Sequence, residues 1–219
     1  MLENNPQTLV STSWLLKHLN DPDLRIIDAS WYLPKMNRNG FKEYKDNHIP
    51  GARFFDIDEI CDLQNNLPHM APTPQKFVSR MKAMGIGDGH QIVIYDGHGI
   101  FSSARVWWMF RLFGKKNVAV LDGGLPKWLE AKNPTDNKSP VLRDRHITVQ
   151  FQAGLIKDVT QVASASKLST STILDARSMS RFKGEEVEPR PGLRSGHIPG
   201  SKNLHYEINI HNLKKKLFL

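Results

Sequence analysis

Residues 91–131, QIVIYDGHGIFSSARVWWMFRLFGKKNVAVLDGGLPKWLEA, decide the expected fold. Short runs rich in Ile and Val over 91–96 and 117–122 each end at an aspartate, a pattern typical of buried parallel strands. Between the two runs, apolar residues recur near helical spacing at Ala104, Trp107, Trp108 and Leu112. A further helix is expected over 125–131, after a Gly-Gly break. Strands that alternate with helices predict an α/β fold with a parallel sheet.

The same pattern extends toward the N-terminus. Residues 24–28, LRIID, form a third apolar run that ends at an aspartate. Thr73 followed by Pro74 is typical of a helix N-cap with proline at the first helical position, and predicts a helix from there to about Met84. The alternation of strands and helices therefore covers most of the first half of the chain.

An internal repeat is the clearest sign of how the chain is organised. IIDASWYL at 26–33 precedes DNHIPGARFFDIDEI at 46–60, and ILDARSMS at 173–180 precedes RSGHIPGSKNLHYEI at 194–208. A strand that ends in Asp is followed in both halves by an HIPG turn at nearly the same spacing. This order predicts that one α/β unit has been duplicated.

A polar segment separates the two copies. Residues 132–146, KNPTDNKSPVLRDRH, carry two prolines and form the best linker candidate. We therefore predict a first domain over 1–134, a linker over 135–146 and a second, incomplete domain over 147–219.

Composition narrows the classes of function. The 219 residues carry a net charge of +8, which favours anionic partners in a general way. No nucleic-acid-binding motif occurs, so a small anionic ligand is expected rather than nucleic acid. No run of 18 apolar residues and no basic-then-apolar leader occurs, which predicts a cytoplasmic protein without a membrane partner. One cysteine and no HxxxH or HExxH spacing argue against a disulfide framework, and no metal or cofactor is expected.

These motifs resemble the two-domain sulfurtransferases, rhodanese (thiosulfate sulfurtransferase) and 3-mercaptopyruvate sulfurtransferase. Residues 93–129 resemble the non-catalytic N-terminal domain of that family almost throughout. Residues 175–204, DARSMSRFKGEEVEPRPGLRSGHIPGSKNL, resemble the start of the catalytic domain, and their EPR variant is closer to the mercaptopyruvate enzymes. The resemblance implies tandem rhodanese-like domains, each with a five-stranded parallel sheet flanked by helices.

The resemblance also implies a chemistry. The family moves sulfane sulfur from 3-mercaptopyruvate or thiosulfate to a thiophilic acceptor, such as cyanide or a protein thiol, through a cysteine thiolate that becomes a persulfide. Arg181 and Arg190 match the family positions that bind the anionic end of the donor, a task that suits the planar fork of arginine. Asp96 begins the equivalent loop of the first domain and cannot accept sulfur.

The catalytic cysteine is expected in the matching loop of the second domain, near position 241–245, beyond residue 219. We therefore expect the chain to be inactive in sulfur transfer, as a pseudoenzyme left by a frameshift or premature stop. Two alternatives stay open, a non-catalytic module that binds an anion or a protein, and half of an enzyme completed in trans. A related phosphatase activity needs the same loop cysteine and is excluded with it.

Other chemically capable residues have structural interpretations. Cys61 lies among three acids, which disfavour its thiolate, so it is expected to be non-catalytic. Asp28 and Asp175 are expected to accept backbone N–H bonds at the turns after their strands. His48 and His197 are expected to hold the HIPG turns through local hydrogen bonds rather than to bind metal.

Overall fold

The structure, a computed structural model, describes residues 4–168, 170–189 and 192–206. It divides into two compact units, Leu2–Ala153 and Gly154–Leu219. Each unit is described by itself below, and the predicted α/β fold is confirmed.

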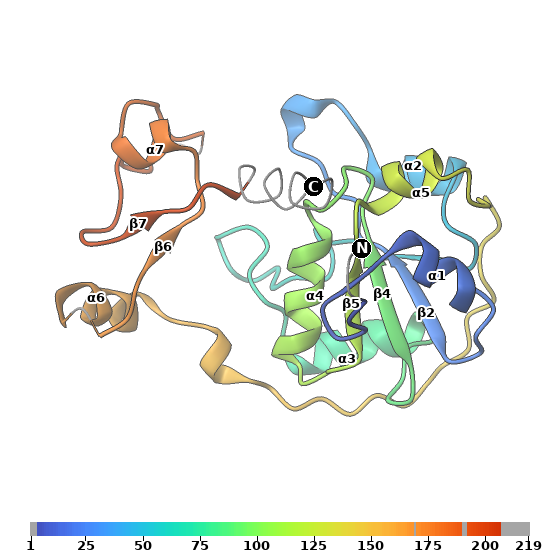
Figure 1. Ribbon diagram of the computed structural model, residues 1–219. Coiled ribbons are helices and arrows are strands. Elements are labelled where there is room, and N and C mark those ends of the chain that lie inside the picture. The colour runs from blue at the N-terminus through green and yellow to red at the C-terminus, as the bar shows by residue number, and fades with distance from the viewer. Residues whose placement is uncertain (1–3, 169, 190–191, 207–219) are drawn as a thin grey trace. The chain divides into compact units, whose positions relative to one another are not determined.

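The first unit is built on a five-stranded sheet (Figure 1). Its strands are β1 (Leu9–Val10), β2 (Leu24–Asp28), β3 (Arg53–Phe54), β4 (Gln91–Tyr95) and β5 (Val118–Leu121). They lie in the order β1-β5-β4-β2-β3, and every neighbouring pair is parallel. The central strand β4 is buried from Ile92 to Tyr95, as expected for a parallel strand covered on both faces.

Helices cover both faces of this sheet. They are α1 (Thr12–His18), α2 (Gly40–Asp46), α3 (Pro74–Ala83), α4 (Ser103–Leu112) and α5 (Gly124–Glu130), with a 3-10 turn η1 (Pro34–Met36) before α2. Leu15 of α1, Tyr44 of α2 and Trp128 of α5 share one core cluster with alternate residues of the central strands. Phe77 of α3 packs edge to face on Phe110 of α4, with ring centroids 5.3 Å apart. Because alternate strand residues point to opposite faces, these two groups of helices complete a three-layer unit.

The buried face of α4 differs from the one predicted. Val106, Met109 and Phe110 are buried, whereas Ala104 is exposed. The contact between Phe110 and Phe77 fixes the rotation of the helix, so the apolar periodicity that includes Ala104 does not mark the core face.

The segment predicted as a linker lies against the first unit. His48 and Asp136 exchange two backbone hydrogen bonds of 2.7 and 2.8 Å, and further backbone bonds to this unit continue as far as Gln152. Because these bonds tie residues 135–152 to the sheet and its helices, the division between the units falls after Ala153 rather than within 135–146.

The second unit contains α6 (Val159–Leu168), β6 (Leu174–Asp175), α7 (Met179–Lys183) and β7 (Lys202–Asn203), after the 3-10 turn η2 (Ala153–Leu155). β6 pairs in parallel with β7 in the register with which β2 pairs with β3. Asp175 stands opposite Asn203 as Asp28 stands opposite Phe54, so the two motifs that suggested a repeat share this strand register. In the described parts of both units, no helix is long and apolar enough to cross a membrane.

Candidate functional site

The loop between β4 and α4 holds an anion that belongs to the chain itself. The buried Asp96 carboxylate accepts hydrogen bonds of 2.7–2.9 Å from the N–H groups of His98, Gly99, Phe101 and Ser103. A fifth bond comes from the Ser103 hydroxyl. Backbone N–H groups that converge before a helix form an anion cradle, and Asp96 fills this one.

Two side chains from the segment before α2, those of Tyr32 and Arg38, lie over the loop between β4 and α4. Arg38 pairs with Glu43 at 2.7 Å, lies 3.9 Å above the Tyr32 ring and donates to the carbonyl of Gly97. Tyr32 donates its hydroxyl to Glu43 at 2.7 Å, and burial together with this bond raises the pKa of Tyr32. A Cβ on Gly97 would lie 2.2 Å from the Tyr32 hydroxyl, so only glycine fits under this cover.

A His–Asp pair on the first unit has the geometry of a proton-transfer group. His69 Nε2 lies 2.6 Å from Asp58 Oδ1, and Trp31 Nε1 donates to both Asp58 oxygens at 3.0 and 3.1 Å. The Trp31 ring also meets the imidazole edge-on at 5.1 Å. An imidazole oriented by a carboxylate at one nitrogen can exchange a proton at the other. Sequence reasoning missed this pair because its two members belong to no recognised spacing.

The environment of Cys61 disfavours a thiolate. Its Sγ donates to the backbone carbonyl of Asp58 at 3.1 Å, and the side chain is buried. Burial raises the pKa of the thiol, and the charges of Asp58 and Glu59 act in the same direction while Lys76 opposes them. A thiol held in this way is a poor nucleophile.

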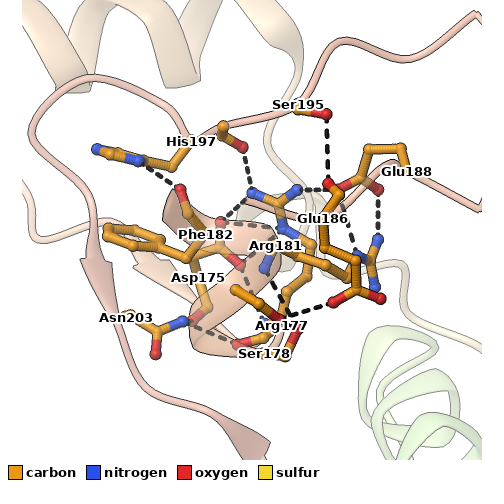
Figure 2. A network of polar contacts seen from close by, with 12 residues as sticks. Asp175, Arg177, Ser178, Arg181, Phe182, Glu186, Glu188, Ser195, His197 and Asn203 are labelled. Atoms are coloured by element: carbon orange, nitrogen blue, oxygen red, sulfur yellow. Dashed lines mark hydrogen bonds and ion pairs between the residues drawn. The ribbon is translucent and has the colours of Figure 1, made fainter. Parts of the chain in front are cut away.

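In the second unit, Arg181 lies in a network of ion pairs (Figure 2). Its Nε and Nη2 donate to the two oxygens of Glu188 at 3.2 and 2.5 Å. Arg177 donates to the same carboxylate through Nη1 at 2.7 Å. Arg177 is held in turn by both oxygens of Asp175 and by the carbonyl of Gly196. Paired in this way, the carboxyl of Glu188 has its pKa lowered, chiefly by the hydrogen bond from Arg181.

Arg190, the second predicted donor-binding residue, lies outside the described residues. In the sequence it follows Glu188 by two positions. The structure therefore places Arg181 in a polar network and gives no position for Arg190.

The two strand-end aspartates take the turn role predicted for them. Ser30 N donates to Asp28 Oδ1 at 2.9 Å, and Arg177 N donates to Asp175 Oδ1 at 3.0 Å. The pKa values of the two carboxyl groups shift in opposite directions. Burial raises the pKa of Asp28 to about 6, whereas the hydrogen bond from Arg177 lowers the pKa of Asp175.

The histidines of the two HIPG turns also make the local bonds predicted for them. His48 stacks on Tyr44 with ring centroids 4.4 Å apart, and His197 stacks on Phe182 at 3.9 Å. In each pair the histidine Nδ1 lies 2.7 Å from the carbonyl oxygen of the aromatic residue. The aromatic residue thus marks the same position in both units.

This correspondence shows how the two units differ in charge. The residue before the aromatic partner is Glu43 in the first unit and Arg181 in the second. Glu43 is paired with Arg38, and Arg181 is paired with Glu188, so the ion pair is reversed between the copies. At this position the first unit therefore has a carboxylate and the second unit a guanidinium.

Comparison with known protein families and sequences gives consistent matches. Residues 11–131 match the Rhodanese-like domain family. The chain is 43% identical to "Thiosulfate/3-mercaptopyruvate sulfurtransferase 1, mitochondrial" of Arabidopsis thaliana, over 90% of this chain and 57% of that protein. It is 40% identical to the 3-mercaptopyruvate sulfurtransferase of Escherichia coli K12, over 89% of this chain and 70% of that protein. The chain thus spans less than two thirds of the length of the Arabidopsis relative.

Solved structures of sulfurtransferases also match the chain. SseA from Escherichia coli, a 3-mercaptopyruvate sulfotransferase with the rhodanese fold, matches with a TM-score of 0.82 and 37% identity, over 90% of this chain and 74% of SseA. Tum1 from Saccharomyces cerevisiae matches with a TM-score of 0.78 and 29% identity, over 93% of this chain and 71% of Tum1.

Proposed function

Because the chain belongs to the rhodanese family of sulfurtransferases, we propose that it serves the transfer of sulfane sulfur from a small anionic donor to a thiophilic acceptor. The donor is 3-mercaptopyruvate or thiosulfate, and the acceptor is cyanide or the thiol of a partner protein. The observation that carries this proposal is the Arg181 guanidinium, which is fixed by a buried carboxylate yet about a quarter exposed.

The chain contributes the groups that bind the donor. Arg181 and Arg190 hold its anionic end, the carboxylate of 3-mercaptopyruvate or the sulfonate oxygens of thiosulfate. Guanidinium groups bind such planar or trigonal oxygen sets through paired hydrogen bonds, which fixes the orientation of the donor as well as its charge.

The thiolate that accepts the sulfur is not Cys61. Its burial, its bond to a carbonyl and its raised pKa all oppose nucleophilic attack. Cys61 is the one cysteine of the 219-residue sequence, so we propose that these residues alone do not turn over either donor.

Donor binding is the part of the proposal that this chain tests directly. We would titrate the chain with thiosulfate and with 3-mercaptopyruvate and follow binding by calorimetry and NMR. Arg181→Ala removes a charge-assisted bidentate contact and is expected to weaken binding roughly 10- to 100-fold. Arg194→Ala removes the same charge from an exposed residue of the following segment and is the matched control. Equal losses in both variants, or no binding by the unaltered chain, would contradict the proposal.

Catalysis is tested in a fusion protein. Residues 1–206 would be joined to the C-terminal part of the Escherichia coli relative, and sulfur transfer to cyanide would be measured. The proposal expects turnover that depends on Arg181 and on the thiol of the added part, and that Cys61→Ser leaves unchanged. Cytoplasmic location belongs to the same proposal, and fractionation would test it, because the Arabidopsis relative is named as mitochondrial.

A further inference from the structure

We propose that Glu188 is the positioning residue of the donor site. It fixes one edge of the Arg181 guanidinium and so presents the opposite edge to the anionic donor. This inference rests on the proposed function, because it assigns a task to the site at which the donor binds.

Glu188 is exceptional in its burial. Among the described residues of the second unit it is the one buried residue, and its side chain is 4% exposed. A carboxylate that leaves water needs compensating partners, because the cost of burying an unpaired charge is large. Glu188 has these partners in Arg177 and Arg181, which both donate to it.

The bonds between Arg181 and Glu188 use only one edge of the guanidinium. Nε and one Nη2 hydrogen point to the carboxylate of Glu188. Nη1 and the second Nη2 hydrogen form another edge, which makes no side-chain or backbone bond within the described part of the chain. An arginine has five N–H donors in a fixed plane, so an edge bound to Glu188 sets the direction of the free edge.

Glu188 is itself held in place from the other side. Arg177 donates to its Oε1, and two bonds of 3.0 and 3.1 Å connect the Nε of Arg177 to the carboxylate of Asp175 (Figure 2). Asp175 is the last residue of strand β6. A continuous set of ion pairs therefore connects the end of a strand to Arg181, and the guanidinium is fixed with respect to the sheet.

The alternative role, a competitor that occupies Arg181 in place of the donor, conflicts with this geometry. To leave Arg181, the carboxylate of Glu188 would have to break both bonds from that guanidinium while Arg177 still holds its Oε1. In the network, the negative charges of Asp175 and Glu188 balance the positive charges of Arg177 and Arg181. Glu188 therefore contributes orientation to the site rather than attraction.

The test uses this difference between charge and orientation. Glu188→Gln keeps the size of the side chain and makes the chain more positive by one charge. If Glu188 acted only through its charge, its removal would strengthen the binding of thiosulfate. Positioning predicts the opposite, a loss of affinity of at least about fivefold. Glu185→Gln makes the same change of charge at an exposed residue three positions earlier and is expected to change the affinity by less than twofold.

Two further variants separate positioning from a loss of folding. Glu188→Asp keeps the charge but shortens the side chain, so it cannot reach both arginines and is also expected to weaken binding. In an Arg181→Ala background, Glu188→Gln is expected to cause no further loss, because its effect passes through Arg181. NMR spectra of the backbone would confirm that each variant retains the β6–β7 pair.

The outcomes are distinct. Unaltered or tighter thiosulfate binding by Glu188→Gln, in a chain that binds thiosulfate, would overturn the positioning role and leave the proposed function standing. Additive losses in the double variant would also overturn it. If the unaltered chain bound neither donor, the proposed function would fail, and this inference would fail with it.

Discussion

At the scale of single residues, the two units differ in a few side chains that decide what each can bind. The first unit has a carboxylate, Asp96, inside its N–H cradle and a second, Glu43, where the other copy has Arg181. Asp96 fills its own cradle, and Glu43 pairs with Arg38. We propose that these two acids exclude an anionic donor from the first unit.

The cradle of Asp96 gives a direct prediction. Asp96→Ala leaves several buried N–H groups without acceptors and is expected to lower the free energy of unfolding by about 3 kcal/mol or more. Added formate, a carboxylate small enough to enter the vacated space, is expected to restore part of that loss. Urea unfolding with and without formate measures both effects. Asp144→Ala, at an exposed acid, is the control. Equal stability of the two variants would contradict the assigned role of Asp96.

His90 gives a prediction about pH. It is buried, its Nδ1 accepts a hydrogen bond from Gly87 N at 2.8 Å, and burial together with nearby cations lowers its pKa from 6.5 to about 4. The folded state therefore binds the proton less well than the unfolded chain. Neutral His90 therefore contributes about 3 kcal/mol to the free energy of unfolding. This contribution is fully present above pH 6.5 and is lost as the pH falls toward 4.

His90→Gln is expected to remove that part of the pH dependence, whereas His146→Gln, at an exposed histidine, is expected to retain it. The free energy of unfolding would be measured for each variant between pH 4 and 7. A wild-type slope that persists in His90→Gln would show that another group is responsible.

The sequence allowed some of these roles to be predicted and not others. The turn bonds of Asp28 and the stacking turn of His48 depend on neighbours along the chain, so motif and spacing were sufficient. The pairing of His69 with Asp58 and the burial of Glu188 depend on how loops approach one another in three dimensions. Contacts of this kind leave no periodic pattern in the sequence from which they could be predicted.

At the scale of elements, long apolar runs were predicted well and short or polar elements were not. The strands β2, β4 and β5 were predicted within a residue or two, and Thr73 caps α3 as expected by accepting from Lys76 N. The strands β1 and β3 contain two residues each, too few to show a pattern. The sequence of α2, GFKEYKD, is mostly polar and buries only Tyr44, so it carries little helical periodicity.

The junction between β5 and α5 depends on a glycine, which gives a prediction at this scale. Gly124 has a φ of +55°, and a Cβ there would lie 2.4 Å from the carbonyl oxygen of Asp96. Gly124→Ala is expected to cost about 3 kcal/mol, because it adds both backbone strain and a clash with the loop. Gly89→Ala, where no atom lies within 4 Å, is expected to cost less than about 1 kcal/mol. Similar unfolding midpoints in urea for the two variants would contradict this packing.

At the scale of the whole molecule, the two units bury very different amounts of apolar surface. The first contains a continuous core of aliphatic and aromatic residues around the five-stranded sheet. The described part of the second unit buries no apolar side chain and relies on a two-stranded pair and the ion pairs around Glu188. Local opening is therefore expected to be easier in the second unit.

Limited proteolysis measures this difference. Cleavage within 154–206 is expected first, with accumulation of a fragment that ends near Ala153 and resists further digestion. Mass spectrometry of the fragments over time would locate each cut. Equal resistance of the two units would contradict the difference in burial as the basis of their stability.

We propose that this chain presents a donor-binding arginine but no sulfur-accepting thiolate. The most direct test is a sulfur-transfer assay of the purified 219-residue chain and of its Cys61→Ser variant. Both 3-mercaptopyruvate and thiosulfate would be offered with cyanide as acceptor, and the Escherichia coli relative would serve as the active control. We expect no turnover by either form of the chain. Turnover by the unaltered chain that Cys61→Ser abolishes would contradict the account, because the buried thiol would then be the nucleophile.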